Sequence, residues 1–217
     1  METKRFMMRM MLAATTLAAL SCSNSHKDES SEPVPVPDIT TATFTSPLTI
    51  DNPYLPLTPG SVSVFFLDAD EDPEVVVVEV LDETRDVMSI ATRVVRDRVF
   101  VDELLIADTH DWYAQDDDGN VWYMGEDSTS YEYDENGDLI GSDTEGSWEA
   151  GADVDGIGEN AQAGHIMTAA PSPLAPSYNQ EFYRGIAEDA AVVIAVGVTV
   201  ELENGATYEN CVQTLEW

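Results

Sequence analysis

The stretch spanning residues 106–127 most constrains the fold, because it places two aromatic runs on either side of a tight-turn sequence. The intervening Asp-Asp-Asp-Gly-Asn contains residue types that tolerate the positive φ of a hairpin turn. With a loop of two or four residues, Trp112 shares a face with Tyr123, and Tyr113 shares the other with Trp122. Both faces are then aromatic. We therefore expect a hairpin covered on both sides, at the centre of an antiparallel sheet.

Short strand-like runs flank this hairpin on both sides. They are rich in β-branched and aromatic residues, and Gly, Pro, Asn and Asp separate them; the runs cover residues 61–68, 74–81, about 87–95, 98–108, 130–133, about 145–150, 180–186, 190–201 and 207–216. No helical periodicity interrupts this series. The pattern predicts an all-β domain over 44–217, as a curved barrel-like sheet or a sandwich. Residues 149–176, rich in Gly, Ala and Pro, form an expected long irregular loop and a candidate binding surface.

The N-terminus has the form of a secretory signal peptide over residues 1–21. Basic residues precede a short apolar run, and small residues lead to Cys22. The sequence Ala-Leu-Ser-Cys resembles the lipobox of bacterial lipoproteins, and that resemblance implies that Cys22 carries the lipid. An ordinary signal peptide with an incidental cysteine stays open as the alternative. The lipid would hold the protein in the cell envelope, at the outer membrane or the periplasmic face, and residues 22–43, rich in Ser, charge and Pro, read as a disordered tether.

Composition limits the partners of the chain. Forty-two Asp and Glu against nine Lys and Arg give a formal net charge of -33. Nucleic acid is excluded as a partner, because phosphate binding needs a basic surface. If Cys22 is lipidated, Cys211 has no disulfide partner, and we interpret Cys211 as a small core residue.

Several motifs of the β domain resemble those of an uncharacterised family of secreted or lipid-anchored bacterial proteins. They are Asn-Pro-Tyr-Leu-Pro-Leu with Pro-Gly (52–60), Asp-Trp-Tyr-Ala-Gln-Asp (111–116), Gly-Asn-Val-Trp-Tyr with Gly-Glu (119–126), Glu-Gly-Ser-Trp-Glu-Ala-Gly (145–151) and Gln-Glu-Phe-Tyr with Gly and Ala-Glu-Asp (180–189). The resemblance implies no activity, cofactor or catalytic residue. This chain differs at Thr168, where the family tends to have Pro, and the family usually continues past the equivalent of Trp217. On that comparison the domain lacks its last strands, and we expect an open sheet edge or barrel seam.

A calcium site is the most specific chemical hypothesis. The oxygen-bearing residues at positions 1, 3, 5 and 12 of an EF-hand-like loop are Asp134, Asn136, Asp138 and Glu145. Leu139 stands where that loop needs Gly, and strand-like flanks replace helices, so a plain hairpin turn is favoured. A second oxygen-rich set, equally open to a Ca²⁺ interpretation, is Asp116, Asp117, Asp118 and Asn120. We expect no other cofactor.

Catalytic signatures are sparse. The histidines are His26, His110 and His165, and no HExxH, GxSxG, P-loop or GxGxxG motif occurs. We interpret the chain as a binding or envelope-structural module for an unknown small-molecule or protein partner, and not as an enzyme. The alternative is an extracytoplasmic hydrolase of glycan or ester that uses two carboxylates as acid and base.

Overall fold

The computed structural model describes residues 34–67 and 73–217. The predicted signal peptide, Cys22, His26 and the first part of the tether lie outside the described residues. Among the described residues, no helix has the length and apolar character needed to cross a bilayer.

The described chain is almost entirely β-structure, which confirms the predicted fold class. One 3₁₀ helix, η1 (Ile39–Thr41), precedes the strands. The strands are β1 (Val62–Leu67), β2 (Glu74–Val87), β3 (Ile90–Val101), β4 (Leu104–Gln115), β5 (Val121–Tyr133), β6 (Leu139–Asp143), β7 (Trp148–Glu149), β8 (Gln162–Met167), β9 (Tyr178–Asn179), β10 (Glu181–Phe182), β11 (Ala190–Glu201) and β12 (Thr207–Glu216).

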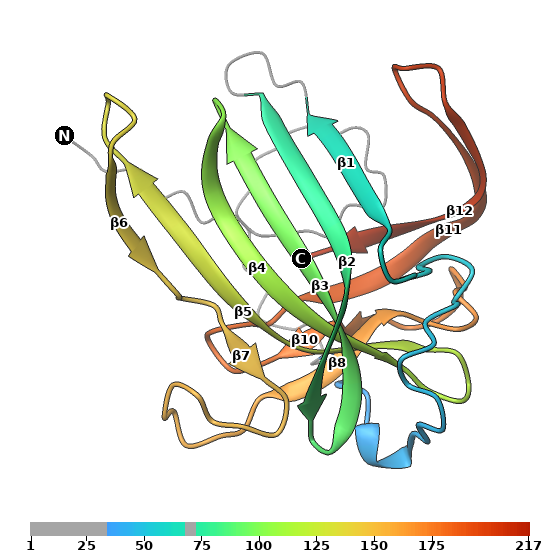
Figure 1. Ribbon diagram of the computed structural model, residues 1–217. Helices are drawn as coiled ribbons and strands as arrows, with labels where there is room; N and C mark the ends of the chain where they lie inside the picture. Colours follow the sequence, from blue (N-terminus) through green and yellow to red (C-terminus); the bar gives the residue numbers. More distant parts are fainter. Residues whose placement is uncertain (1–33, 68–72) are drawn as a thin grey trace, which may run out of the picture.

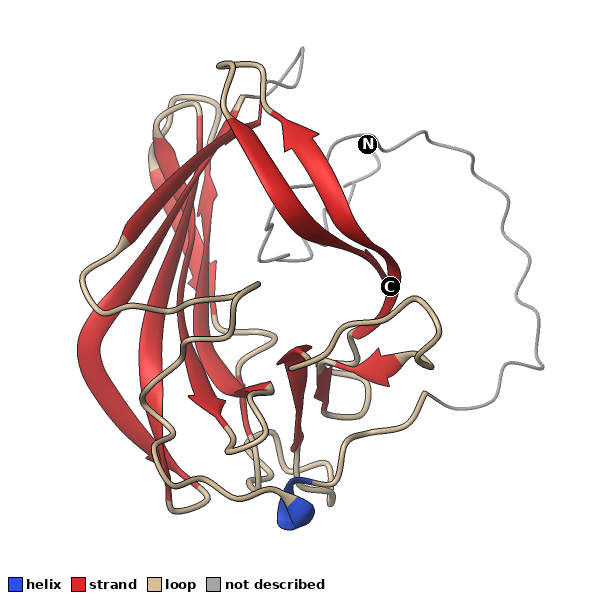
Figure 2. Ribbon diagram, turned by 90° about the vertical axis from the view of Figure 1, so that its right-hand side faces the viewer, coloured by secondary structure: helices blue, strands red, loops and turns tan. Residues whose placement is uncertain are grey.

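The strands form a strongly curled antiparallel sheet and a second, small sheet (Figure 1). The large sheet has the order β1-β2-β3-β4-β5-β8-β10, with β6 and β7 also pairing with β5. The small sheet has the order β12-β11-β9. Figure 2 shows the large sheet as a half-barrel, with the β11–β12 hairpin across from its hollow side. The arrangement fits the curved, barrel-like alternative of the prediction.

The turns between the long strands differ from those expected. β2 continues through residues 82–84, where a gap between two strand-like runs indicates a turn, and β3 continues through the gap between the runs about 87–95 and 98–108. The chain reverses instead at Met88–Ser89 and at Asp102–Glu103, where all four residues have positive φ. Two-residue hairpin turns of this kind usually carry Asn-Gly. Neither turn has Gly at its second position, so turn composition did not indicate them.

The loop of the central hairpin holds five residues, which corrects the expected faces. Gln115 pairs with Val121, and Tyr113 pairs with Tyr123. The odd loop length places Trp112 and Trp122 on one face and the two tyrosines on the other. We name the face of Val95, Asp111 and Tyr113 the inner face and that of Arg96, Asp108 and Trp112 the outer face.

Both faces of the hairpin are covered, as predicted. Tyr113 and Trp122 are each 2% exposed, although they lie on opposite faces. On the outer face Phe44 packs edge-on against Trp122 at a centroid distance of 6.2 Å. The last part of the predicted tether also contacts the domain, because the Pro35 carbonyl accepts the Asn179 N–H at 3.2 Å.

The segment 149–176 is irregular over most of its length but contains β8, which pairs with β5. At the opposite side of the large sheet, β1 has β2 as its one neighbour in the described sheet. Its outward residues Val62, Val64 and Phe66 are exposed, Phe66 by 77%. β12 likewise ends the small sheet. One edge of each of these strands is therefore unpaired within the described sheets.

Candidate functional site

Five acidic residues from different elements come together at the inner face. We name them the inner carboxyl cluster: Asp97 on β3, Asp111 on β4, Glu126 on β5, Glu181 on β10 and Asp189 before β11. Asp111 and Glu126 are direct cross-strand partners. Asp97 and Asp111 are each 2% exposed and Glu181 is 7% exposed. Acidic residues are rarely so deeply buried without a cationic partner.

A β-bulge brings Tyr123 to the same face as Glu126. Tyr113 pairs with Tyr123, whereas the preceding Trp112 pairs with Gly125, so Met124 is an extra residue on β5. Gly125 has φ +137°, and a Cβ there would lie 2.4 Å from the backbone oxygen of Trp148. Only glycine fits this position, because β7 passes directly against it.

Aromatic side chains line the inner carboxyl cluster. The Tyr123 hydroxyl donates to Asp111 Oδ1 at 2.6 Å. Tyr123 stacks on Tyr113 at 5.0 Å and meets the Trp148 ring edge-on at 5.3 Å. Within the described part of the chain, several buried polar atoms have no ordinary hydrogen-bond partner: Asp97 Oδ1, Asp111 Oδ2, Glu181 Oε2 and Trp148 Nε1. The interior is thus crowded with polar groups that are incompletely satisfied.

Burial and mutual repulsion raise the pKa values of four carboxyls of the cluster, those of Asp97, Asp111, Glu126 and Glu181. Burial is the larger cause and raises the pKa of Asp97 to about 7 and those of Glu126 and Glu181 to about 8. The pKa of Asp111 is also raised well above its usual value, first by burial and then by Glu126. Glu126 and Glu181 therefore hold protons at neutral pH.

The nearest basic residue on the same face does not compensate the inner carboxyl cluster. Arg93 is buried two residues before Val95, but its guanidinium donates to the Leu81 carbonyl at 3.3 Å and approaches Asp82 at 3.8 Å. Its charge is not among the causes that shift the pKa of Asp111 or Glu126. In the described chain, the cluster lies beside aromatic side chains and forms no ion pair with an arginine.

The residues of the EF-hand-like hypothesis lie in two separate turns. Asp134, Asn136 and Asp138 form the β5–β6 turn, and the Asp134 carboxylate accepts the backbone N–H groups of Asn136 and Asp138 at 2.8 and 3.0 Å. These hydrogen bonds lower the pKa of Asp134. Glu145 follows β6, and its backbone N–H donates to the Asp143 carboxylate. In the described parts of the chain, no three or more His, Cys, Asp or Glu side chains are placed to hold a metal ion.

The second oxygen-rich set has structural partners. Asp116 accepts Asn120 N–H and Trp122 Nε1–H, both at 2.8 Å, and so closes the hairpin loop. Asp117 accepts the Thr45 N–H at 2.8 Å and its hydroxyl at 2.7 Å, which ties the N-terminal segment to the sheet. Asp118 is exposed.

The two described histidines lie away from the inner carboxyl cluster. His110 is on the outer face of β4, opposite Arg96 and Asp127. His165 is on β8, with its ring centroid 4.1 Å from that of Trp122. Burial lowers the pKa of His165 to about 4, so this imidazole is neutral over the physiological range. The structure brings carboxyls together without a histidine base.

Sequence reasoning did not single out the inner carboxyl cluster as a site. Asp111, Glu126, Glu181 and Asp189 all lie within the motifs that carry the family resemblance, and Asp97 does not. A usable signal existed in Asp111, which is an acidic residue inside the predicted central hairpin, whereas Asp97 falls in the gap between two predicted runs. With so many acidic residues in the chain, that signal alone could not separate buried from exposed carboxyls.

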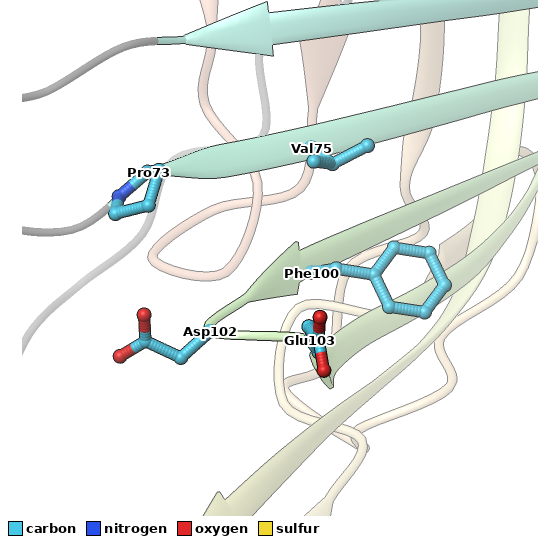
Figure 3. Close-up of a pocket in the computed structure, with 5 residues that line it drawn as sticks. All are labelled: Pro73, Val75, Phe100, Asp102 and Glu103. Carbon is cyan, nitrogen blue, oxygen red and sulfur yellow. The ribbon is translucent and has the colours of Figure 1, made fainter.

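A second feature lies on the outer face near the β3–β4 turn. Pro73, Val75 and Phe100 line a pocket whose border carries Asp102 and Glu103. Figure 3 shows Val75 and Phe100 on neighbouring strands and the two acidic residues in the turn. An aromatic and aliphatic floor with carboxylates beside it suits a ligand that carries positive charge.

No protein-family model, curated protein or solved structure matches this chain. The likeness to secreted and lipid-anchored bacterial proteins therefore depends on the motifs given above.

Proposed function

We propose that the protein is a lipid-anchored, extracytoplasmic module of the bacterial cell envelope that binds a cationic partner. The observation that carries the binding proposal is the pairing of every basic residue in the described chain. Residues 34–67 and 73–217 contain five arginines and no lysine, and each arginine lies within 4 Å of a carboxylate. An anionic ligand finds no uncompensated positive side chain among these residues.

The outer pocket at the β3–β4 turn offers a first contact for such a partner. Phe100 supplies an aromatic ring, and Asp102 and Glu103 supply negative charge beside it. A lysine or arginine side chain of a partner protein can place its aliphatic stem on Val75 and its charge near the carboxylates. The anchor part of the proposal comes from the leader and Cys22.

The binding test uses a lysine-rich peptide and an equally long glutamate-rich peptide in calorimetric titrations. The lysine-rich peptide is expected to bind, with an affinity that falls as salt rises. The double variant Asp102→Asn/Glu103→Gln should weaken binding about tenfold, or about 1.4 kcal/mol. The matched control Glu135→Gln/Asp138→Asn removes the same charge at the exposed β5–β6 turn. Equal losses in both variants would argue against a contact at the pocket.

The anchor is tested in a bacterial host. The mature wild-type protein should begin at Cys22, carry acyl mass and partition with membranes, while Cys22→Ala should be released or left unprocessed. A soluble wild-type protein with an unmodified N-terminus contradicts this part of the proposal.

One observation favours a hydrolase as the second candidate. Asp111 and Glu126 face one another across β4 and β5, and both have raised pKa values, as an acid in a carboxylate pair requires. Chromogenic glycosides and esters would report turnover. A hydrolase should lose all turnover in Asp111→Asn or Glu126→Gln, whereas a binding module should show none in the wild type.

A further inference from the structure

The inner carboxyl cluster is closed on one side by a small hairpin spanning residues 181–189. Tyr183 and Ala187 form an isolated bridge within this hairpin, and the Gln180 N–H donates to the Asp189 carbonyl at 2.8 Å. β10 pairs with β8 over Glu181 and Phe182 alone. The Tyr183 hydroxyl donates to Asp153 at 2.7 Å and adds a side-chain link. The 181–189 hairpin is thus held by few main-chain contacts to the large sheet.

Tyr183 and Ala187 of this hairpin pack in the hydrophobic core, and its acidic residues add a contact that needs a proton. Glu181 and Asp189 are close enough for a side-chain hydrogen bond, which two carboxyls can form only when at least one carries a proton. Glu181 also faces Asp111, and both Glu181 and Asp189 act on Glu126. The neighbouring side chains are those of Tyr113, Tyr123 and Trp148, and none of them carries positive charge.

The remaining charged groups at the inner face do not offset this repulsion. Asp97 and Glu74 add negative charge from β3 and β2. Arg93 is directed to Leu81 and Asp82. If the carboxyls ionise together, several negative charges face one another in a poorly hydrated interior.

We propose that proton occupancy of the inner carboxyl cluster controls the docking of the 181–189 hairpin, which is seated while the carboxyls hold protons and is released when they lose them. This inference does not depend on the cationic partner proposed above. The hairpin is the element expected to move, because Glu181 and Asp189 lie on it and Asp97, Asp111 and Glu126 lie on long, extensively paired strands.

The sign of the effect follows from the proton count. The folded protein holds protons on Glu126 and Glu181 up to about pH 8, whereas an unfolded glutamate loses its proton near 4.5. Between these values the native state binds more protons than the unfolded chain, so stability falls as the pH rises. Local release of the hairpin should follow the same direction over the upper part of that window.

Hydrogen–deuterium exchange of peptides covering 178–190, at pH 5.5 and pH 8.5 and corrected for intrinsic exchange, tests this directly. In the wild type, protection of this segment should fall at least about tenfold at the higher pH, while peptides from β4 and β5 change less. Glu181→Gln keeps a polar side chain without the ionisation and should retain protection at pH 8.5. Glu188 is exposed and precedes Asp189 in the same hairpin, so Glu188→Gln is the control and should behave as the wild type.

A second variant keeps the test decisive if Glu181→Gln folds poorly. Asp189→Asn removes the carboxyl that acts on Glu181 from the same hairpin and should also flatten the pH dependence. The proposal is overturned if wild-type protection at 178–190 is the same at both pH values. It is also overturned if the folded variants at 181 or 189 keep the full wild-type pH dependence.

Discussion

Two aspartates on β4 show how the face of a strand decides the behaviour of a side chain. Asp108 lies on the outer face and receives two hydrogen bonds from Arg96, at 2.8 and 2.5 Å, which lower its pKa. Asp111 lies three residues further along on the inner face, where burial and Glu126 raise its pKa. The two carboxyls are chemically identical, but the environment lowers the pKa of Asp108 and raises the pKa of Asp111.

Amide substitutions at these two positions should therefore act in opposite directions at pH 8.5. Asp108→Asn should lower stability by about 1 kcal/mol, because Arg96 loses a charged partner at a partly exposed site. Asp111→Asn keeps an acceptor for the Tyr123 hydroxyl and removes a carboxyl that is costly to ionise, so its melting temperature should equal or exceed that of the wild type. Thermal melts at pH 5.5 and 8.5 measure both effects. Equal destabilisation of the two variants would count against the assignment of the faces.

Gly125 gives a second test at the scale of single residues. Gly125→Ala should destabilise by about 3 kcal/mol or more, since the new Cβ meets β7 backbone and positive φ adds strain. Gly146→Ala is the matched control, with φ +97° and open space around the position. Urea unfolding should show a much smaller loss for this control. Similar losses would mean that backbone strain, and not crowding, decides both cases.

At the scale of elements, the sequence predicted the central hairpin and its two-sided cover but not its register. The five-residue loop and the bulge at Met124 each shift the alternation by one residue. Neither is visible in a pattern of apolar and polar residues, because aromatic side chains occupy both faces. The inner carboxyl cluster depends on the bulge, since Tyr123 and Glu126 could not otherwise share a face. For that reason the fold class was predictable and the candidate site was not.

The turns of the long strands show the same limit and suggest a stabilising change. Asp102 and Glu103 have φ values of +50° and +68°. Asp tolerates this region better than Glu does, so the backbone strain falls mainly on Glu103. Asp102→Asn/Glu103→Gly should raise the free energy of unfolding by about 1 kcal/mol. Asp102→Gln/Glu103→Gln removes the same charges without favouring the turn and serves as the control. An equal gain in both variants, measured by urea unfolding, would assign the effect to charge.

At the scale of the whole molecule, acidic residues dominate both the interior cluster and the surface. The formal net charge is -33, and the arginines of the described chain are each engaged by a carboxylate. Exposed carboxylates that lie within the screening length of one another, about 8 to 10 Å at physiological salt, repel. This repulsion opposes the compact state.

Salt should therefore stabilise the folded protein at pH 8. The melting temperature is expected to rise steadily between low salt and about 0.5 M NaCl, because screening at that concentration shortens the range of repulsion. KCl at the same ionic strength should act alike, which separates screening from specific ion binding. A melting temperature that falls with salt would show that the five ion pairs outweigh the general repulsion.

Because the edge of β1 is unpaired in the described sheet, the net negative charge of the chain affects its solubility. An open strand edge with exposed Val62, Val64 and Phe66 can pair with another chain, and no Pro or Lys in the strand prevents it. Mutual repulsion of highly charged copies keeps such edges apart at neutral pH. Acid favours the folded state, because Glu126 and Glu181 bind protons more tightly there than in the unfolded chain. Near the sequence pI of 4.1 it also removes the repulsion between molecules. The pH at which one copy is most resistant to heat therefore lies close to the pH at which a concentrated solution is most prone to precipitate.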